Sequence, residues 1–184
     1  MAQKKRIIVI GGSAAGPKSA AKARRIDNDA EVIILQKEAD LSMASCGYPY
    51  YVGGYFDDRN ALLCTPTGVV RNPLFYLNAK DIDARVNTEV TNINTKDHSV
   101  SFTNAVSGET GTLTYDKLII ATGAVPRMPP VPGTDFDGIM TLQSMKDADF
   151  LRKIRDEEEI KKAVVIGGGL IGIETCEALQ LAGI

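Results

Sequence analysis

The stretch LSMASCGYPYYVGG, from Leu41 to Gly54, places one cysteine among small and aromatic residues with no second cysteine close by. A single thiol can shuttle two electrons by forming a mixed disulfide with a small thiol, or by becoming a sulfenic acid. Either route needs the thiolate, which a helix N-terminus or a nearby cation favours. Ser42 is placed to cap a helix that brings Cys46 into its first or second turn. Cys46 is therefore the candidate catalytic residue, and the alternative is a buried, inert thiol.

Two glycine-rich turns lie near opposite ends of the chain, each after an apolar run. Residues 11–16 (GGSAAG) fit the dinucleotide pattern G-x-G-x-x-G if Ser13 replaces the middle glycine, and residues 167–172 (GGGLIG) fit it completely. The first glycine permits a tight turn, the second lets a pyrophosphate approach, and the third allows close packing of helix on strand. The helix N-terminus adds unpaired N–H groups and partial positive charge. Two such turns together indicate two dinucleotides.

The residue expected to hold the ribose is an acid at the end of the second strand, about 20 residues after the turn. This sequence has Gln36 there, followed by Lys37 and Glu38. A glutamine can still donate to and accept from a ribose hydroxyl. For the second turn the corresponding residue would lie beyond Ile184, so the sequence predicts NAD(P)H without a preference between the two forms.

The elements around the first turn are of the α/β type. Residues 6–35 form a strand, a glycine turn, an alanine-rich helix and a second strand, which is a βαβ unit. Residues 86–115 contain short strands separated by turn-rich segments and predict a three-stranded antiparallel meander. A buried strand is expected at the start of residues 117–123, and the proline-rich residues 125–133 are expected to be a connector.

The last part of the chain predicts a capped helix and a second strand–turn–helix. Ser144 and Asp147 have the spacing of a capping box, and the following helix is expected to reach the charged run RDEEEIKK. Residues 163–184 then begin another strand, glycine turn and helix. Such a unit without its returning strand leaves an open sheet edge. We therefore expect a fragment of a longer protein; the alternative is a short protein that ends in a helix.

Composition excludes several classes of function. The 184 residues carry a formal net charge of −2, which gives no reason to expect nucleic-acid or membrane-surface binding. The apolar runs are of strand length, too short to span a membrane, and the N-terminus is not a signal peptide. Three widely spaced cysteines do not form a disulfide framework, so a reducing cytoplasm is expected. The sequence holds no zinc-type Cys/His cluster, P-loop or Ser-His-Asp arrangement, and no metal site is expected.

Three motifs together resemble the flavoprotein disulfide reductase superfamily with two dinucleotide sites. They are GGSAAG, YDKLIIATGAVP (residues 115–126) and VVIGGGLIGIE (residues 164–174). The SMASCGYPYY segment is similar to the single-cysteine branch, which holds coenzyme A-disulfide reductases, NADH-dependent persulfide reductases, NADH oxidases and NADH peroxidases. The Cys-Gly-x-Pro-Tyr form, from Cys46 to Tyr50, is closer to the two reductases than to the oxidases.

The resemblance implies a Rossmann-like FAD-binding domain over residues 1–145, with a parallel sheet plus an antiparallel β-meander. Residues 146–184 would begin a second, truncated Rossmann-like NAD(P)-binding domain. The implied cofactor-binding residues belong to the two turns and to the ends of three strands: Gly11, Ser13, Ala14, Ala15, Gly16, Gln36, Lys37, Val90, Ala121, Thr122, Gly123, Gly167, Gly169 and Gly172.

A basic stripe on the first helix is a candidate substrate site. Lys18, Lys22 and Arg25 recur at i, i+4 and i+7, a spacing that also suits a solvated helix face. In coenzyme A-disulfide reductases the matching positions line the coenzyme A site, together with those of Ser42 and Ser45. Basic groups suit the phosphates of coenzyme A.

The resemblance implies an oxidoreductase that passes electrons from NAD(P)H through FAD to a disulfide between Cys46 and a small thiol. Its substrate would be coenzyme A disulfide, a persulfide or a related sulfur species, with coenzyme A as substrate or bound ligand, and the complete protein would be a homodimer. One alternative is an NADH oxidase or peroxidase with Cys46 as sulfenic acid. Another is a non-catalytic FAD-binding fragment. Cys176 is expected in the core, and for Cys64 the sequence decides no role, although it favours a structural one slightly.

Overall fold

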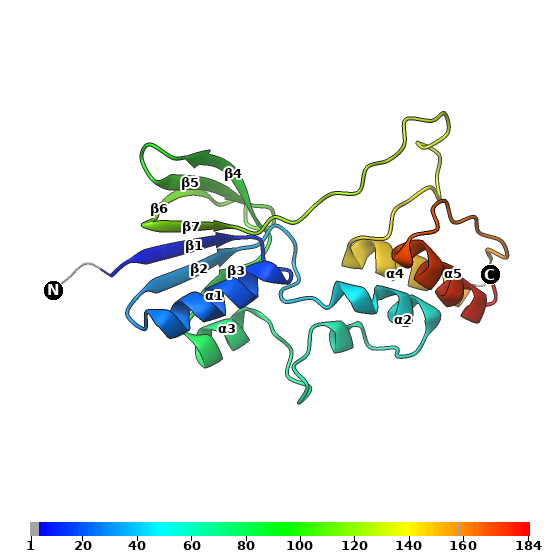
Figure 1. Cartoon of the computed structure of the whole chain (residues 1–184), viewed down its shortest axis with the longest axis horizontal. Coiled ribbons are helices and arrows are strands. Elements are labelled where there is room, and N and C mark those ends of the chain that lie inside the picture. The colour runs from blue at the N-terminus through cyan, green and yellow to red at the C-terminus, as the bar shows by residue number, and fades with distance from the viewer. Residues whose placement is uncertain (1–3, 158) are drawn as a thin grey trace. The chain divides into compact units, whose positions relative to one another are not determined.

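The computed structural model describes residues 4–157 and 159–184, which form two compact units. The first unit holds the described residues up to Met43 together with Leu63–Gly123. The second holds Ala44–Leu62 and the described residues from Ala124 onward. The helices and strands of both units are labelled in Figure 1. The division into cofactor domains after residue 145 stays a prediction.

A four-stranded parallel sheet is the centre of the first unit. Its order is β3-β2-β1-β7. The strands are β1 (Arg6–Ile10), β2 (Glu31–Leu35), β3 (Asp83–Arg85) and β7 (Lys117–Ile120). The predicted βαβ unit is confirmed, because β1 and β2 pair in parallel on either side of the helix α1 (Ala15–Ile26).

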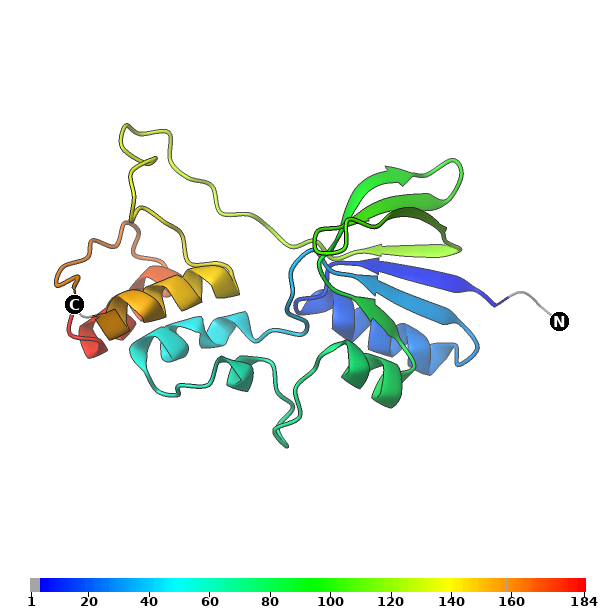
Figure 2. The same cartoon turned by 180° about the vertical axis from the view of Figure 1, so that it is seen from behind.

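Both faces of this sheet are covered, which explains the uninterrupted apolar runs of its strands. Helices α1 and α3 (Pro73–Lys80) lie on one face, and a three-stranded sheet lies on the other (Figures 1 and 2). Side chains alternate along a strand, so Val9 packs toward the helices while Ile8 packs toward the second sheet. Successive residues of β1 thus alternate between the two core clusters, one on each face of the sheet.

The second sheet is the predicted meander, and its three antiparallel strands are confirmed. They are β4 (Thr88–Asn94), β5 (Ser99–Asn104) and β6 (Thr110–Thr114). The prediction of a buried strand after the meander was wrong for β7. This strand pairs with β1 along one edge only among the described residues, and Ile120 is 63% exposed.

Helix α3 was not predicted, although its start carries a local signal. The Asn72 side chain accepts a hydrogen bond of 2.9 Å from the backbone N–H of Phe75, and Pro73 takes the first helical position. Asparagine as N-cap followed by proline is a favoured helix start. The helix ends at Lys80, and Asp81, the C-cap residue, has a left-handed backbone.

The second unit is helical. A 3-10 turn, η1 (Ser45–Gly47), leads directly into α2 (Tyr48–Gly53), and η2 (Arg59–Leu62) follows. Helix α2 packs against both α4 (Met145–Glu157) and α5 (Leu170–Leu181). The predicted capping box of α4 is confirmed. The Ser144 hydroxyl accepts from the Asp147 N–H at 3.2 Å, and the Asp147 carboxylate accepts from the Ser144 N–H at 2.7 Å.

The strand predicted before the second glycine turn is not formed. Val164 and Ile166 are 87% and 88% exposed, and the chain there has no regular secondary structure. A strand exists only through hydrogen bonds to a neighbour. No segment between residues 4 and 184, residue 158 apart, pairs with it. As far as the chain is described, none of its helices has the length and apolar character needed to cross a membrane.

Arg152 of α4 fixes the end of α2. Its Nη1 donates to the carbonyl oxygens of Tyr51 at 2.8 Å and Phe56 at 3.2 Å, and its guanidinium lies 5.4 Å from the centre of the Tyr51 ring. Burial opposes the charge, but hydrogen bonds and ion pairs with Asp57 and Asp156 outweigh it and raise the pKa of Arg152. Only 11% of this side chain is exposed.

We expect Arg152→Met to lower the free energy of unfolding by about 2 to 3 kcal/mol, because two carbonyl acceptors and the ring contact lose their partner together. Urea unfolding followed by circular dichroism measures the change. Lys153→Met is the matched control. That exposed lysine forms an ion pair with Glu157 at 3.5 Å on the helix surface, and its loss should cost less than about 0.5 kcal/mol. Equal losses in the two variants would contradict the assigned role of Arg152.

Candidate functional site

The first glycine turn joins the carboxyl ends of three strands. Gly11 has a positive φ of 101° and donates its N–H to the Leu35 carbonyl at 2.8 Å. A Cβ on Gly11 would lie 2.2 Å from the Ala121 carbonyl oxygen, and one on Gly16 would lie 1.8 Å from the Gly11 carbonyl oxygen. Neither position has room for a side chain, so the turn keeps α1 tight against β1, as a dinucleotide site requires.

The start of α1 is open to an anion. Ala14, the N-cap residue, makes no side-chain capping bond, and the first turn of α1 contains no acidic residue. Ser13, Ala14 and Ala15 are all exposed. The helix N-terminus thus offers backbone N–H groups and a partial positive charge without a competing carboxylate.

Gln36 lies beneath this turn rather than on the surface. Its Oε1 accepts from the Gly12 N–H at 2.8 Å, and its Nε2 donates to the Asp40 carbonyl at 3.1 Å. The residue is 8% exposed. These contacts place Gln36 at the predicted site and show that it supports the turn; its contact with a ribose stays a prediction.

The other predicted residues of the first cofactor site lie in the same unit. Ala121 follows β7 and donates its N–H to the Ile10 carbonyl at 2.8 Å, which brings the segment Ala121–Gly123 to the end of β1. Val90 of β4 packs against the core cluster on the meander side of the sheet. Lys37 is exposed and its Nζ lies 2.9 Å from a carboxylate oxygen of Glu89, whose hydrogen bond and charge raise the pKa of Lys37.

The second glycine turn repeats the geometry of the first. Gly167 has a φ of 114°, and a Cβ on Gly172 would lie 2.1 Å from the Gly167 carbonyl oxygen. Gly169 is the N-cap of α5 and makes no side-chain capping bond, and the first turn of α5 has no acidic residue. In both turns the last glycine therefore packs closely on the carbonyl of the first, although the strand before the second turn is not formed; the binding of a pyrophosphate by either turn stays a prediction.

Cys46 lies at the head of α2 with an exposed side chain, which contradicts the alternative of a buried thiol. The predicted cap was wrong: Ser42 has a left-handed backbone with φ of 54°, and its N–H donates to the Gly12 carbonyl at 2.7 Å. The helical segment starts three residues later, at Ser45, which is also exposed. The backbone of Ser42 is instead hydrogen-bonded to the first glycine turn.

The aromatic residues after Cys46 divide into packed and exposed ones. Tyr48 and Tyr51 are buried, whereas Tyr50 is exposed and its ring meets that of Tyr55 edge-on at 5.4 Å. Burial raises the pKa of Tyr51, and the Asp149 carboxylate adds to the rise. Tyr50 is thus the tyrosine of this motif that solvent can reach.

The prediction for Cys176 was wrong, because its side chain is exposed. Helix α5 buries Thr175, Ala178 and Leu179, a stripe at i, i+3 and i+4 that excludes Cys176. Cys64 is half-buried and forms an isolated antiparallel bridge with Val70, in keeping with a structural role.

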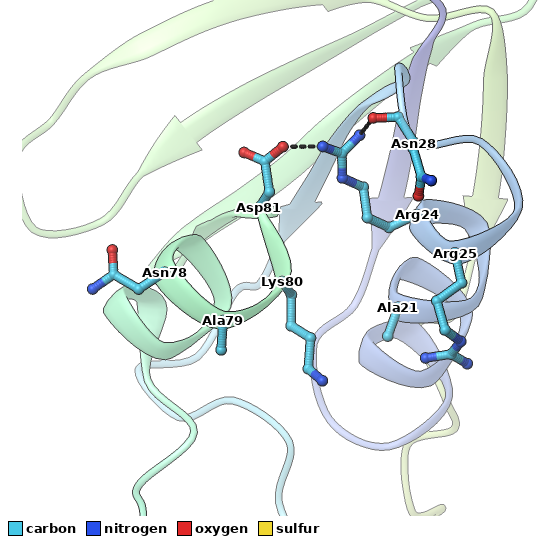
Figure 3. Close-up of a pocket in the computed structure, with 8 residues that line it drawn as sticks. All are labelled: Ala21, Arg24, Arg25, Asn28, Asn78, Ala79, Lys80 and Asp81. Atoms are coloured by element: carbon cyan, nitrogen blue, oxygen red, sulfur yellow. Dashed lines mark hydrogen bonds and ion pairs between the residues drawn. The ribbon is translucent and has the colours of Figure 1, made fainter.

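The basic stripe of α1 borders a pocket. Lys18, Lys22 and Arg25 are exposed on one helix, and Arg25 also lines a cavity of about 340 Å³ between α1 and α3. The lining residues are Ala21, Arg24, Arg25, Asn28, Asn78, Ala79, Lys80 and Asp81 (Figure 3). Arg24 is committed to Asp81 and to the Asn28 carbonyl. Figure 3 shows the Lys80 and Arg25 side chains extending in the same direction, away from the Arg24–Asp81 ion pair.

Lys80 is therefore a candidate residue that sequence reasoning missed. It ends α3, and its Nζ lies 6.0 Å from the centre of the Phe75 ring. The Asn72-Pro73 helix start is a local signal for α3, but the position of Lys80 beside α1 follows only from the packing of the two helices. Together with Arg25 it makes the pocket positively charged on one side.

The family described as Pyridine nucleotide-disulphide oxidoreductase matches residues 5–184. The chain belongs to this family. A curated relative, Coenzyme A disulfide reductase of Staphylococcus haemolyticus, is 36% identical over 180 residues, which are 98% of this chain and 39% of the relative. A second, NADH oxidase of Methanocaldococcus jannaschii, is 30% identical over 182 residues, 97% of this chain and 38% of the relative.

A solved structure of a NAD-dependent persulfide reductase from A. fulgidus has the same fold. The TM-score is 0.93 with 38% sequence identity, over 97% of this chain and 32% of that one. The predicted mixed α/β fold of a two-dinucleotide oxidoreductase is confirmed by this likeness and by the family match. The chain spans about two fifths of the length of the curated relatives it matches.

Proposed function

We propose that the protein is an FAD-dependent oxidoreductase that uses NAD(P)H to reduce a small disulfide or persulfide through Cys46, with coenzyme A disulfide as the leading substrate. The exposed Cys46 thiol, in a chain with two dinucleotide turns, is the observation that carries the proposal. The similarity to a coenzyme A disulfide reductase and a persulfide reductase supports the substrate class.

The residues of the first turn fit FAD. Gly11 and Gly16 leave the backbone unobstructed, the start of α1 offers N–H groups to a pyrophosphate, and Thr122 and Gly123 lie in the segment that follows β7. FAD, when bound, would accept a hydride from NAD(P)H and make two electrons available to a disulfide. The second turn, with Gly167, Gly169 and Gly172, would hold the pyrophosphate of NAD(P)H.

Cys46 would supply the sulfur chemistry. Its thiolate attacks one sulfur of the disulfide, a new S–S bond forms, and the first small thiol leaves as thiolate. Two electrons then cleave that mixed disulfide, which releases the second thiolate and restores Cys46; protons from solvent complete the two thiol products. Oxidation of NAD(P)H supplies both electrons, so the reaction balances.

The pocket beside the basic stripe favours a phosphate-bearing substrate. Arg25 and Lys80 place two cations on one side of it, and Lys18 and Lys22 continue the charge along α1. Coenzyme A carries three phosphates in its nucleotide part, and cationic side chains bind phosphate oxygens strongly. This charge supports coenzyme A derivatives over uncharged disulfides.

A second candidate function is an NADH oxidase or peroxidase that cycles Cys46 through a sulfenic acid, supported by the similarity to an NADH oxidase. The test uses protein extended to the length of its relatives and follows NADH oxidation with coenzyme A disulfide, with oxygen or with peroxide. Turnover dependent on coenzyme A disulfide supports the reductase. Turnover with oxygen or peroxide alone favours the second candidate. Bound flavin without NADH oxidation would favour the non-catalytic alternative.

We expect Lys80→Ala to raise the KM for coenzyme A disulfide about fivefold and to leave kcat nearly unchanged. A partly exposed ion pair is worth up to about 1 kcal/mol, which corresponds to such a factor. Steady-state kinetics measures both constants. Lys96→Ala is the control, because Lys96 lies in the turn between β4 and β5, away from the pocket lining. An unchanged KM in Lys80→Ala would remove the pocket from the substrate site.

A further inference from the structure

The residue expected to hold the ribose at the first turn is already engaged. Gln36 replaces the usual acid, it is neutral, and both ends of its amide bond to the protein: Oε1 to the Gly12 N–H and Nε2 to the Asp40 carbonyl. The side chain is also buried beneath the turn. Oε1 keeps a second lone pair and Nε2 a second N–H, but burial beneath the turn shields both from a ribose hydroxyl, so a more exposed side chain is better suited to bind it.

Glu89 is held at the same end of the sheet. The first residues of β4 are tied to the segment after β2: the Thr88 N–H donates to the Gln36 carbonyl at 2.7 Å and the Asn87 N–H to the Glu38 carbonyl at 3.1 Å. In open α/β sheets, ligands bind at the carboxyl ends of the strands. The strand start that carries Glu89 is therefore fixed beside the expected ribose position.

The Glu89 side chain is accessible and oriented by a partner. Side chains alternate along β4, and Val90 packs into the core cluster while Glu89 faces solvent. Its carboxylate lies 2.9 Å from the Lys37 Nζ, and about half of the side chain remains exposed. A carboxylate has about four lone-pair sites, so the ion pair leaves capacity for two hydroxyl donors.

We propose that Glu89, oriented by Lys37, is the carboxylate that binds the ribose hydroxyls of the adenosine half of the dinucleotide at the first turn. The assignment of Glu89 rests on one part of the proposed function, the binding of FAD at the first glycine turn. Position 36, where an acidic residue is expected, holds a glutamine. Glu89 would supply the missing carboxylate from β4 instead of from the end of β2. Lys37 holds the carboxylate and partly compensates its charge near the phosphates.

The test measures nucleotide binding by protein freed of flavin. FAD is titrated by flavin fluorescence, and ADP and 2′,3′-dideoxy-ADP are titrated as competitors. We expect Glu89→Gln to weaken FAD and ADP about tenfold, because a hydrogen bond to a charged group is lost, while dideoxy-ADP binds as it does to the wild type. Glu38→Gln is the matched control; it removes the same charge next to Lys37 and should leave all three affinities unchanged.

The outcomes separate the two hypotheses. Wild-type protein that binds neither FAD nor ADP would overturn the proposed function. Wild-type protein that binds FAD, with Glu89→Gln equal to it, would overturn the assignment of Glu89 alone. A Glu89→Gln variant that loses ADP and dideoxy-ADP equally would also overturn it, because the effect would then not depend on the hydroxyls. Equal melting temperatures by circular dichroism establish that the variants are folded.

Discussion

Replacement of Cys46 by serine is expected to abolish the reduction of coenzyme A disulfide by protein of the length of its relatives, with kcat lowered at least about a thousandfold. Removal of an essential nucleophile has effects of this size or larger. The thiolate is the species that attacks a disulfide, and a hydroxyl neither ionises near neutral pH nor forms the mixed disulfide. The exposed position of Cys46 makes its sulfur accessible to a small disulfide.

Intact mass under non-reducing conditions gives a second, independent reading of the same variant. We expect one coenzyme A adduct after incubation with coenzyme A disulfide, removed by reductant and absent from Cys46→Ser. Cys176→Ser is the matched control, since that thiol is also exposed, and it should keep both the adduct and the turnover. A Cys46→Ser protein that keeps turnover would contradict the mechanism. Oxygen added at Cys46 by peroxide, without any adduct, would favour the oxidase or peroxidase.

The features that the sequence predicted well are set by short-range rules. Gly16 was assigned from spacing alone, and a Cβ there would strike the carbonyl oxygen of Gly11, which lies in the same turn. The capping box of Ser144 and Asp147 depends on residues three apart, and it forms as predicted. The meander followed from turn-rich segments between short strands. In each case the interacting residues lie close together in the sequence, so a local sequence pattern is enough to predict the interaction.

The features that were missed or misassigned depend on partners far along the chain. The ion pair of Lys37 with Glu89 joins the segment after β2 to β4, and no local pattern marks it. Cys176 is exposed because α2 covers a different face of α5. The sequence of α5 alone does not determine which of its faces is buried. Ser42 bonds to Gly12 rather than capping a helix. The ion pair, the exposure of Cys176 and the Ser42 hydrogen bond all depend on how segments distant in the sequence pack together.

The largest structural effect is expected at Gly16. In Gly16→Ala the new Cβ would lie 1.8 Å from the Gly11 carbonyl oxygen and 3.2 Å from Val9 Cγ1, so either the turn opens or α1 moves away from β1. Backbone atoms cannot yield as a flexible side chain can. We expect the free energy of unfolding to fall by about 3 kcal/mol, the upper range for overpacking of a core. Urea unfolding followed by circular dichroism measures this loss.

The same variant tests whether the turn holds FAD. Displacement of α1 moves the N–H groups that would contact the pyrophosphate, so FAD affinity should fall at least about a hundredfold, measured by flavin fluorescence. Gly168→Ala is the control: its Cβ would meet no atom within 4 Å, and both stability and FAD affinity should stay unchanged. A Gly16→Ala protein with wild-type affinity would mean that close packing of α1 on the turn is not what positions the nucleotide. The assignment of FAD to residues 11–16 would then lose its steric basis.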